Sequence, residues 1–468
     1  MEIEEQMRTG RMGMLLAKFS IPAIIGMFFT SLYNMADMIF VGKGVGSDGL
    51  AVLTVCFPFM IMTMGFGILV SGGGASLLSR ALGAKDRETA NTTVSNATVL
   101  SLLIGIILTI GALVFMDPLL RSMGSSERLL PMTRGYFLYS LIGNVIFPLV
   151  ICLIYLLQAG GRPKASMATM VSGCLLNLVL DPLFIFGFNM GVDGAALATS
   201  FSQGLSLLTG LSFLLLGRKF ATVKLKYFVP KIAILKEILG IGLAPFLSMM
   251  GSSLVLILAN NLIGKYGGDL YLSILGIVTK LNMFLKLPIN GLGQGMQPLA
   301  GHNFGAKNLE RVKEVSYLTM VVGSLFSILV FAVAMLFPQF LLEAFSNEKA
   351  IIEAGIDPLR IMMFSFILAG IMESGLTLFV AIGKKIQALI VSLAYRLFCL
   401  LPIMIIAPLF IGLNGVLLAF PVSELVGATI IACWFIENGN GLLRKKYNIF
   451  EFQVLHRRAG SVEYAYDK

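Results

Sequence analysis

One apolar stretch, residues 174–186, carries side chains that can bind a cation. Asn177 and Asp181 lie four residues apart in it, so a helix would place both on one face. A carboxylate near the centre of a bilayer costs about 3 kcal/mol on insertion scales, and such acids therefore usually serve a function. Asp37 is a second isolated acid, inside the first apolar run. Either the acids form a site, or each merely pairs with a neighbouring helix.

The chemistry expected of two such acids is cation exchange. Two carboxylates close together in a medium of low dielectric cannot both stay charged, so one binds a proton or both share a cation. Pro182 follows Asp181 directly and cannot continue the helical hydrogen-bond ladder. We therefore expect a helix kink at Pro182, beside the carboxylate.

The composition places these residues in a membrane protein. Of the 468 residues, 57% are hydrophobic and 13% are charged, whereas a soluble domain has about 25% charged residues. The net charge of +10 is concentrated in alternate loops, which is typical of membrane topology and not of nucleic-acid binding. All five cysteines fall in apolar segments, with no spacing that indicates a metal site or disulfides. We expect membrane lipid around the protein and no nucleic-acid partner.

Twelve apolar runs are long enough to cross a bilayer, which takes about 20 helical residues. They lie at residues 15–41, 50–79, 92–116, 132–158, 165–187, 192–216, 237–263, 270–301, 314–337, 357–382, 387–411 and 415–437. Placing both termini in the cytoplasm puts most of the 35 Lys and Arg residues inside. We predict an all-α polytopic protein of the cell (inner) membrane. Its parts are a cytoplasmic N-terminus (1–14), an N-terminal six-helix lobe (15–216), a cytoplasmic linker (217–236), a C-terminal six-helix lobe (237–437) and a cytoplasmic tail (438–468).

The two halves of the chain repeat each other. Residues 83–88, Gly-Ala-Lys-Asp-Arg-Glu, return 222 residues later at 305–310 as Gly-Ala-Lys-Asn-Leu-Glu. Residues 191–194 match residues 412–415 at nearly the same offset. Six spans is an even number, so both copies enter the membrane from the same side and form a parallel repeat. We expect two six-helix bundles in a V around a central cavity, as in an alternating-access transporter, although a fold alone does not fix function.

These features together resemble the multidrug and toxic compound extrusion (MATE) family of secondary transporters. The resemblance covers about residues 10–440. It rests on the twelve-span repeat, on Gly-Ala-Lys after the second and eighth spans, on residues 158–164 (Gln-Ala-Gly-Gly-Arg-Pro-Lys), and on Asn177-x3-Asp181-Pro182 followed by residues 194–199. It implies export of amphipathic, often cationic drugs and toxins, coupled to H⁺ or Na⁺, with no other cofactor.

The resemblance also implies where the coupling ion binds. Members of this type place polar residues of the first, fifth and sixth spans around one pocket, and the matching residues are Asp37, Asn177, Asp181 and Thr199. Amide and hydroxyl oxygens would complete a shell for a hard cation such as Na⁺. The C-terminal half departs from the pattern, because aligning Asp181-Pro182 with Ala407-Pro408 puts an alanine in place of the acid. We therefore expect the coupling site in the N-terminal lobe alone.

Other polar residues inside the spans are candidates for further roles. Glu373 and Glu424 are candidates for a second proton site or for a counter-charge to a cationic substrate, and Lys280 is a third charged candidate. Alternatively, each acid pairs with one of the basic residues of the spans, Lys280, Lys286 or Arg396. Gln294 and Gln297, three residues apart on one helix face, either line the cavity or serve packing.

Two other classes of function are alternatives to an antiporter. A flippase or exporter of a lipid-linked or polysaccharide precursor would share the lobes, but it should show a basic cavity for pyrophosphate. A membrane-embedded transferase would need paired acids near a membrane face to hold Mg²⁺, and the acids here lie too deep in their spans. The sequence contains no GxxxxGK[ST] phosphate-binding motif, so it gives no support for transport driven by ATP. We expect a monomeric antiporter, not an enzyme, whose partners are small organic cations.

Overall fold

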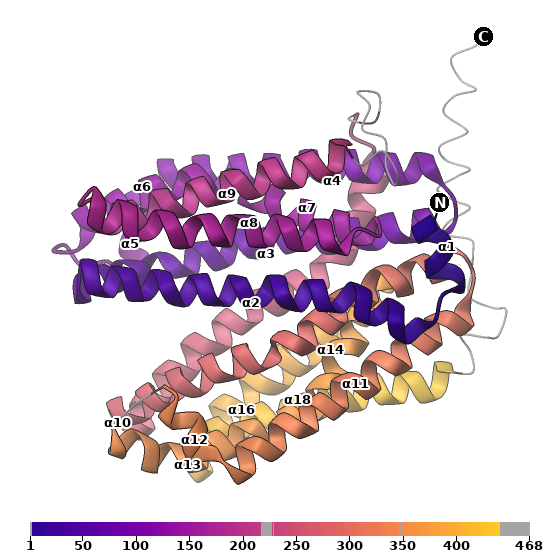
Figure 1. Ribbon diagram of the computed structural model, residues 1–468. Helices are drawn as coiled ribbons and strands as arrows, with labels where there is room; N and C mark the ends of the chain where they lie inside the picture. Colours follow the sequence, from indigo (N-terminus) through magenta and orange to yellow (C-terminus); the bar gives the residue numbers. More distant parts are fainter. Residues whose placement is uncertain (1, 217–226, 228, 346–347, 440–468) are drawn as a thin grey trace.

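The structure is a computed structural model, and it describes residues 2–216, 227, 229–345 and 348–439 (Figure 1). Every regular element in these ranges is a helix. The first half consists of α1 (Glu2–Thr9), α2 (Met12–Gly44), α3 (Ser47–Gly83), α4 (Arg87–Val114), α5 (Met116–Ser122), α6 (Leu130–Asn144), α7 (Phe147–Ala159), α8 (Pro163–Pro182), the π-helix η1 (Leu183–Gly187) and α9 (Gly191–Leu216).

The second half has the same plan. It consists of α10 (Ile232–Gly305), α11 (Leu309–Leu336), α12 (Pro338–Glu343), α13 (Lys349–Met363), α14 (Phe366–Ala381), α15 (Lys385–Leu393), the π-helix η3 (Ala394–Leu400), α16 (Leu401–Ile406), α17 (Pro408–Ile411) and α18 (Leu413–Gly439). In α10 two spans run together across a break at Gly268, whose φ is 70°. The predicted linker and tail lie mostly outside the described residues, although α10 begins at Ile232, inside the predicted linker.

The twelve predicted spans are confirmed in number. Within the described ranges, eleven helical segments are long and apolar enough to cross a membrane, and α13 with α14 forms a twelfth that is bent by 41°. The fourth span is interrupted at the corresponding place, between Asn144 and Phe147. Most of these helices begin a few residues before the apolar run, as α4 does at Arg87 and α11 at Leu309, because polar residues at a membrane surface can continue a helix.

The backbone confirms the internal repeat. Positive φ angles recur in pairs at the predicted offset: Gly46 and Gly268 (83° and 70°), Lys85 and Lys307 (61° and 59°), Gly161 and Gly383 (80° and 75°), and Gly191 and Gly412 (59° and 56°). Asp86 and Asn308 cap the helices that follow the second and eighth spans, each accepting a backbone N–H three residues ahead. Each half is therefore the same six-span unit.

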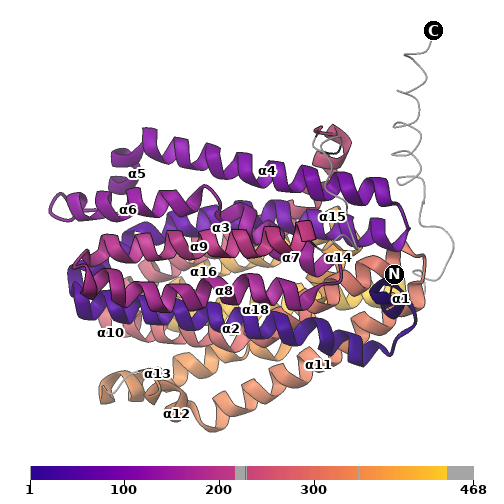
Figure 2. The ribbon, with the colours of Figure 1, turned by 45° about the horizontal axis from the view of Figure 1, so that its top comes forward.

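The two lobes form a V that converges at the end carrying α1 (Figure 1). A view turned by 45° likewise places α1 beside α11 and the end of α10 (Figure 2). At this converging end, Asn303 and Arg311 of the second lobe donate hydrogen bonds to the Met7 carbonyl of α1. The first segment of the chain thus ties the lobes together where they meet.

Close backbone contacts join the lobes along two matching lines. A Cβ on Gly73 of α3 would lie 1.9 Å from the Ile238 carbonyl oxygen, and one on Gly242 would lie 1.7 Å from that of Leu69. The second line joins α2 to the other half of α10, where a Cβ on Gly295 would lie 2.7 Å from the Ser20 backbone nitrogen. Small residues allow such approach between membrane helices, and these positions accept no larger side chain.

Candidate functional site

The polar residues of the fifth and sixth spans lie together in the N-terminal lobe. The Asn177 side-chain amide donates to Asp181 Oδ1 at 3.1 Å and to Thr199 Oγ1 at 3.4 Å. Asn177 and Asp181 are 1% and 0% exposed. α8 supplies the first two residues and α9 the third, and these helices pack on each other. The i, i+4 spacing read from the sequence thus forms a buried cluster.

Asp37 faces the same cluster from α2. This helix packs on α8, where Thr30 Oγ1 lies 3.7 Å from Cys174 Sγ. Asp37 is close enough to Asp181 for the two negative charges to repel each other. Among the described residues, no Lys, Arg or His forms an ion pair with either acid. When both acids are ionised, no basic side chain among the described residues balances their charge.

Three acceptor oxygens of this cluster are buried and have no hydrogen-bond partner within the part of the chain that the structure describes. They are Asp37 Oδ1, Asn177 Oδ1 and Asp181 Oδ2. A buried acceptor without a donor is costly, and a buried carboxylate without a counter-charge is more so. A proton on a carboxyl group, or a small cation among the oxygens, would remove that cost. The donor set contains oxygen only, which suits H⁺ or Na⁺ and does not suit a transition metal.

Two tyrosines of the site are not among the residues expected from the sequence. Tyr33 and Tyr136 both lie within electrostatic reach of Asp37 and Asp181. Tyr33 precedes Asp37 by four residues on α2, so helical spacing alone would have found it. Tyr136 comes from α6, and no sequence signal connects it with the acids.

Pro182 ends the regular part of the fifth span. α8 stops at this residue and the chain continues as the π-helix η1. A π-helix widens the turn, and such turns occur often at functional sites. Gly44, the last residue of α2, lies against Ile185 and Phe186 of η1. The expected break beside Asp181 is thus a change of helix type, packed against the end of the span that carries Asp37.

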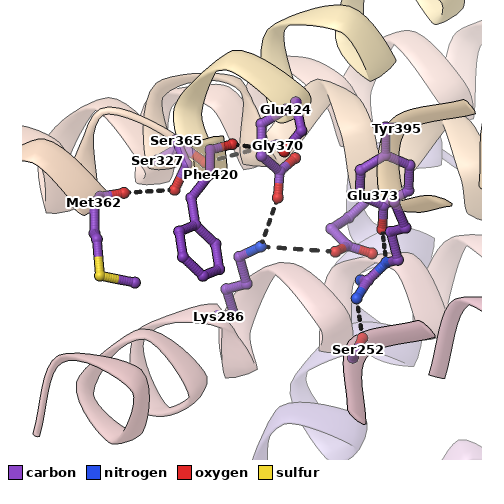
Figure 3. Close-up of polar contacts among 12 residues, drawn as sticks. Ser252, Lys286, Ser327, Met362, Ser365, Gly370, Glu373, Tyr395, Phe420 and Glu424 are labelled. Carbon is purple, nitrogen blue, oxygen red and sulfur yellow. Dashed lines mark hydrogen bonds and ion pairs between the residues drawn. The ribbon is translucent and has the colours of Figure 1, made fainter. Parts of the chain in front are cut away.

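The acids of the C-terminal lobe are paired. Lys286 Nζ lies 3.1 Å from Glu424 Oε1 and 4.0 Å from Glu373 Oε1, so one ammonium serves both acids (Figure 3). Arg396 donates to Tyr395 Oη and Ser252 Oγ. Lys280 is exposed and forms no ion pair within the part of the chain that the structure describes. Glu373 and Glu424 therefore pair with a basic residue of the spans, and that residue is Lys286.

Gln294 and Gln297 lie between the lobes near the converging end. Gln297 Nε2 donates to the backbone carbonyl of Gly72 at 3.2 Å, and the backbone carbonyl of Gln294 accepts from Gln158 Nε2 at 3.0 Å. Both glutamines are buried. They line only a small gap, together with Ala75 and Tyr155. Their contacts are those of residues that hold the lobes together.

Comparison with known proteins finds similarity to MATE transporters, by a family model, by sequence and by structure. The model of the MatE family matches residues 22–183 and 244–418. The chain is 28% identical over 438 residues to the multidrug export protein MepA of Staphylococcus haemolyticus (strain JCSC1435), covering 93% of this chain and 96% of that protein. It is also similar to a crystal structure of MATE in the bent conformation (TM-score 0.89, 27% identity, 95% and 99% of the two chains). A structure described as the outward-facing conformation of a multidrug resistance MATE family transporter matches with a TM-score of 0.88, at 28% identity over 94% and 98% of the chains.

Proposed function

Because the chain belongs to the MatE family, we propose that it is a secondary antiporter that takes up H⁺ or Na⁺ and exports amphipathic, often cationic compounds. The relative named above is a multidrug export protein, which supports a small-molecule substrate. We further propose a monomer in the cell (inner) membrane. The site, the coupling ion and the orientation are parts of this proposal.

The observation that carries the proposal is the unbalanced polar cluster of Asp37, Asn177, Asp181 and Thr199. Its two acids have no basic partner among the described residues, and three of its oxygens lack a donor. Placing such a group in a membrane costs free energy unless a cation binds to it. A cation that enters and leaves this site during each cycle provides the coupling.

The orientation of the V suggests which state the structure represents. The converging end carries α1 and the basic turns after the second, fourth, eighth and tenth spans, which the positive-inside rule assigns to the cytoplasm. The lobes then diverge toward the outside. The similarity to a relative described as outward-facing supports this assignment.

Coupling requires that the cation bind the two lobe shapes with different affinity, since equal affinity would shift no population. A bound cation removes the repulsion between Asp37 and Asp181, which allows α2 and α8 to approach. The contact of Gly44 with Ile185 would transmit this change to η1. The space for a compound bound in the N-terminal lobe would then shrink, and the compound would be released toward the outside.

The decisive experiment is transport of a fluorescent organic cation in proteoliposomes, with H⁺ and Na⁺ gradients imposed separately. We expect one of the two gradients to drive export against the concentration gradient of the dye. Collapsing that gradient with an ionophore should stop export. Movement of the dye that depends on neither gradient would contradict antiport.

The flippase alternative is less well supported. Recognition of a pyrophosphate needs surplus positive charge. Here Lys286 forms ion pairs with Glu373 and Glu424, and Arg396 interacts electrostatically with the same two acids. Transport of a lipid-linked pyrophosphate in the same proteoliposomes, without transport of the dye, would favour it.

A further inference from the structure

The two lobes treat their intramembrane acids differently. In the N-terminal lobe Asp37 and Asp181 lie close together without an ion pair among the described residues. In the C-terminal lobe Glu373 and Glu424 share the ammonium of Lys286. Each lobe thus has two acids within the membrane. Among the described residues, a basic side chain pairs with the acids of the C-terminal lobe and none pairs with those of the N-terminal lobe.

Three spans bring this C-terminal cluster together. Lys286 comes from the second half of α10, Glu373 from α14 and Glu424 from α18. The side chains of Lys286 and Glu424 are only 19% and 13% exposed. Ions removed from water to this degree are strongly destabilising when unpaired, so the contact at 3.1 Å is a structural requirement as long as all three charges are present.

Arg396 completes the charge balance of the cluster. Its guanidinium lies 4.9 Å from the Tyr395 ring centroid and donates to Ser252, so it forms no ion pair within 4 Å among the described residues. It nevertheless interacts electrostatically with both acids. Two basic and two acidic residues make the cluster neutral. Without Lys286 the cluster would carry one negative charge.

The internal repeat shows which residue the other lobe has at this place. The offset of 222 holds at both ends of the second and eighth spans, from Gly46 and Gly268 to Lys85 and Lys307, so no insertion lies between. The position of Lys286 therefore corresponds to Met64. An apolar residue stands where the C-terminal lobe has its ammonium.

We propose that Lys286 is a built-in counter-ion that prevents the C-terminal lobe from taking up a coupling cation, and so confines coupling to the N-terminal lobe. The inference rests on the proposed cation-coupled antiport. Because the ammonium is tethered beside the acids, its effective concentration there far exceeds that of a dissolved ion. Glu373 and Glu424 are thereby kept as permanent, non-exchanging charges. Lys286 decides how many cations the protein binds.

The test is the Lys286→Met variant, which installs the residue of the other repeat. Purified protein in detergent is assayed for bound ²²Na⁺ at equilibrium, and for proton uptake in weakly buffered solution. We expect one additional monovalent cation per protein molecule relative to wild type. Adding Glu424→Gln should remove this gain, because the cluster is then neutral again. Lys286→Gln carries the same expectation if methionine is not accommodated.

Matched controls separate this effect from bulk charge. Lys280→Met removes an exposed lysine from the same helix and should bind as many cations as wild type. Lys286→Arg keeps the positive charge and should also match wild type. A Lys286→Met protein that elutes and melts normally but binds no additional cation would overturn the proposal. A gain in Lys280→Met equal to that in Lys286→Met would do the same.

The design also separates this proposal from the proposed function. The number of cations bound by wild type, compared with Asp181→Asn, tests the N-terminal site. The gain on Lys286→Met is then measured in an Asp37→Asn, Asp181→Asn background. It should persist there at one cation per molecule even if the N-terminal lobe binds none.

Discussion

Among the described residues no basic side chain pairs with Asp37 or Asp181. Because we propose that these two acids bind the coupling cation, replacing either carboxylate should uncouple transport. We expect Asp37→Asn and Asp181→Asn each to reduce gradient-driven dye export at least tenfold, because an amide cannot take up a proton or balance a cation. Binding of the dye to purified protein should be retained. The measurement is export in proteoliposomes under the gradient that drives wild type.

The control for these variants lies in the other lobe. Asn261 of α10 is exposed and donates to the Ile257 carbonyl one turn before it. Asn261→Ala should export at the wild-type rate. Full gradient-driven export by either Asp variant would rule out the N-terminal site.

Residue types and spacing predicted part of this chemistry. Asn177 and Asp181 could be placed together because four residues on one helix define a face. The partner of Glu373 and Glu424 could not be chosen from three basic residues, since the choice depends on how α10, α14 and α18 pack. Lys286 lies 87 residues from Glu373 and 138 from Glu424, and no local pattern spans such distances.

Helices and their ends were more predictable than their partners. Apolar runs identified all twelve spans, and turn residues located the repeat, because both are local properties. The sequence did not show which glycines bring two backbones together. Gly242 and Gly276 both lie in α10, yet a Cβ would strike the Leu69 carbonyl at the first and meet nothing within 4 Å at the second.

This difference gives a matched pair of variants on one helix. Gly242→Ala should push α3 and α10 apart and lower the melting temperature by several degrees, because a backbone carbonyl cannot move aside alone. Gly276→Ala should leave the melting temperature unchanged or raise it slightly, since alanine favours a helix. Thermal unfolding of the purified proteins measures both. Equal melting temperatures would show that the lobes do not meet as the structure has them.

The π-helix after Pro182 provides a prediction at the same scale. Pro182→Ala restores an N–H that can donate to the Leu178 carbonyl, so α8 should extend and η1 should lose its wider turn. We expect export to slow severalfold while binding of the coupling cation is kept. Pro163→Ala, at the first position of α8 where proline is tolerated, should have little effect. Loss of cation binding in Pro182→Ala would contradict a purely conformational role.

At the scale of the whole molecule, the first prediction concerns orientation. In a cysteine-free background, a cysteine at Ser126, in the loop between α5 and α6, should react with a membrane-impermeant maleimide in intact cells. A cysteine at Lys307, exposed at the converging end, should react only after the membrane is opened. Labelling of position 307 in intact cells would invert the topology, and with it the direction in which the V opens.

The converging end also carries an ion-pair cluster that joins the two lobes. Arg80 of α3 is 7% exposed and lies 3.1 Å from Glu237 of α10, whose other carboxylate oxygen accepts from Lys385 of α15. The repeat position of Arg80 is His302, which is buried and forms no ion pair among the described residues. In the described ranges, an ion pair therefore reinforces one of the two contact lines between the lobes and not the other. In the proposed antiport by alternating access, this cluster would have to open each time the V inverts.

Glu237→Gln should shift the protein away from the state closed at this end. It leaves the Arg80 guanidinium buried without a carboxylate, and breaking such a pair costs about 3–5 kcal/mol, which a separation that admits water would relieve. Spin labels at positions 85 and 307, one on each lobe, should report a longer distance in the variant. Glu127→Gln removes an exposed ion pair within one lobe, that with Arg121, and should leave the distance unchanged. If Glu237→Gln gave the wild-type distance, the cluster would be a structural support of the interface and not its gate.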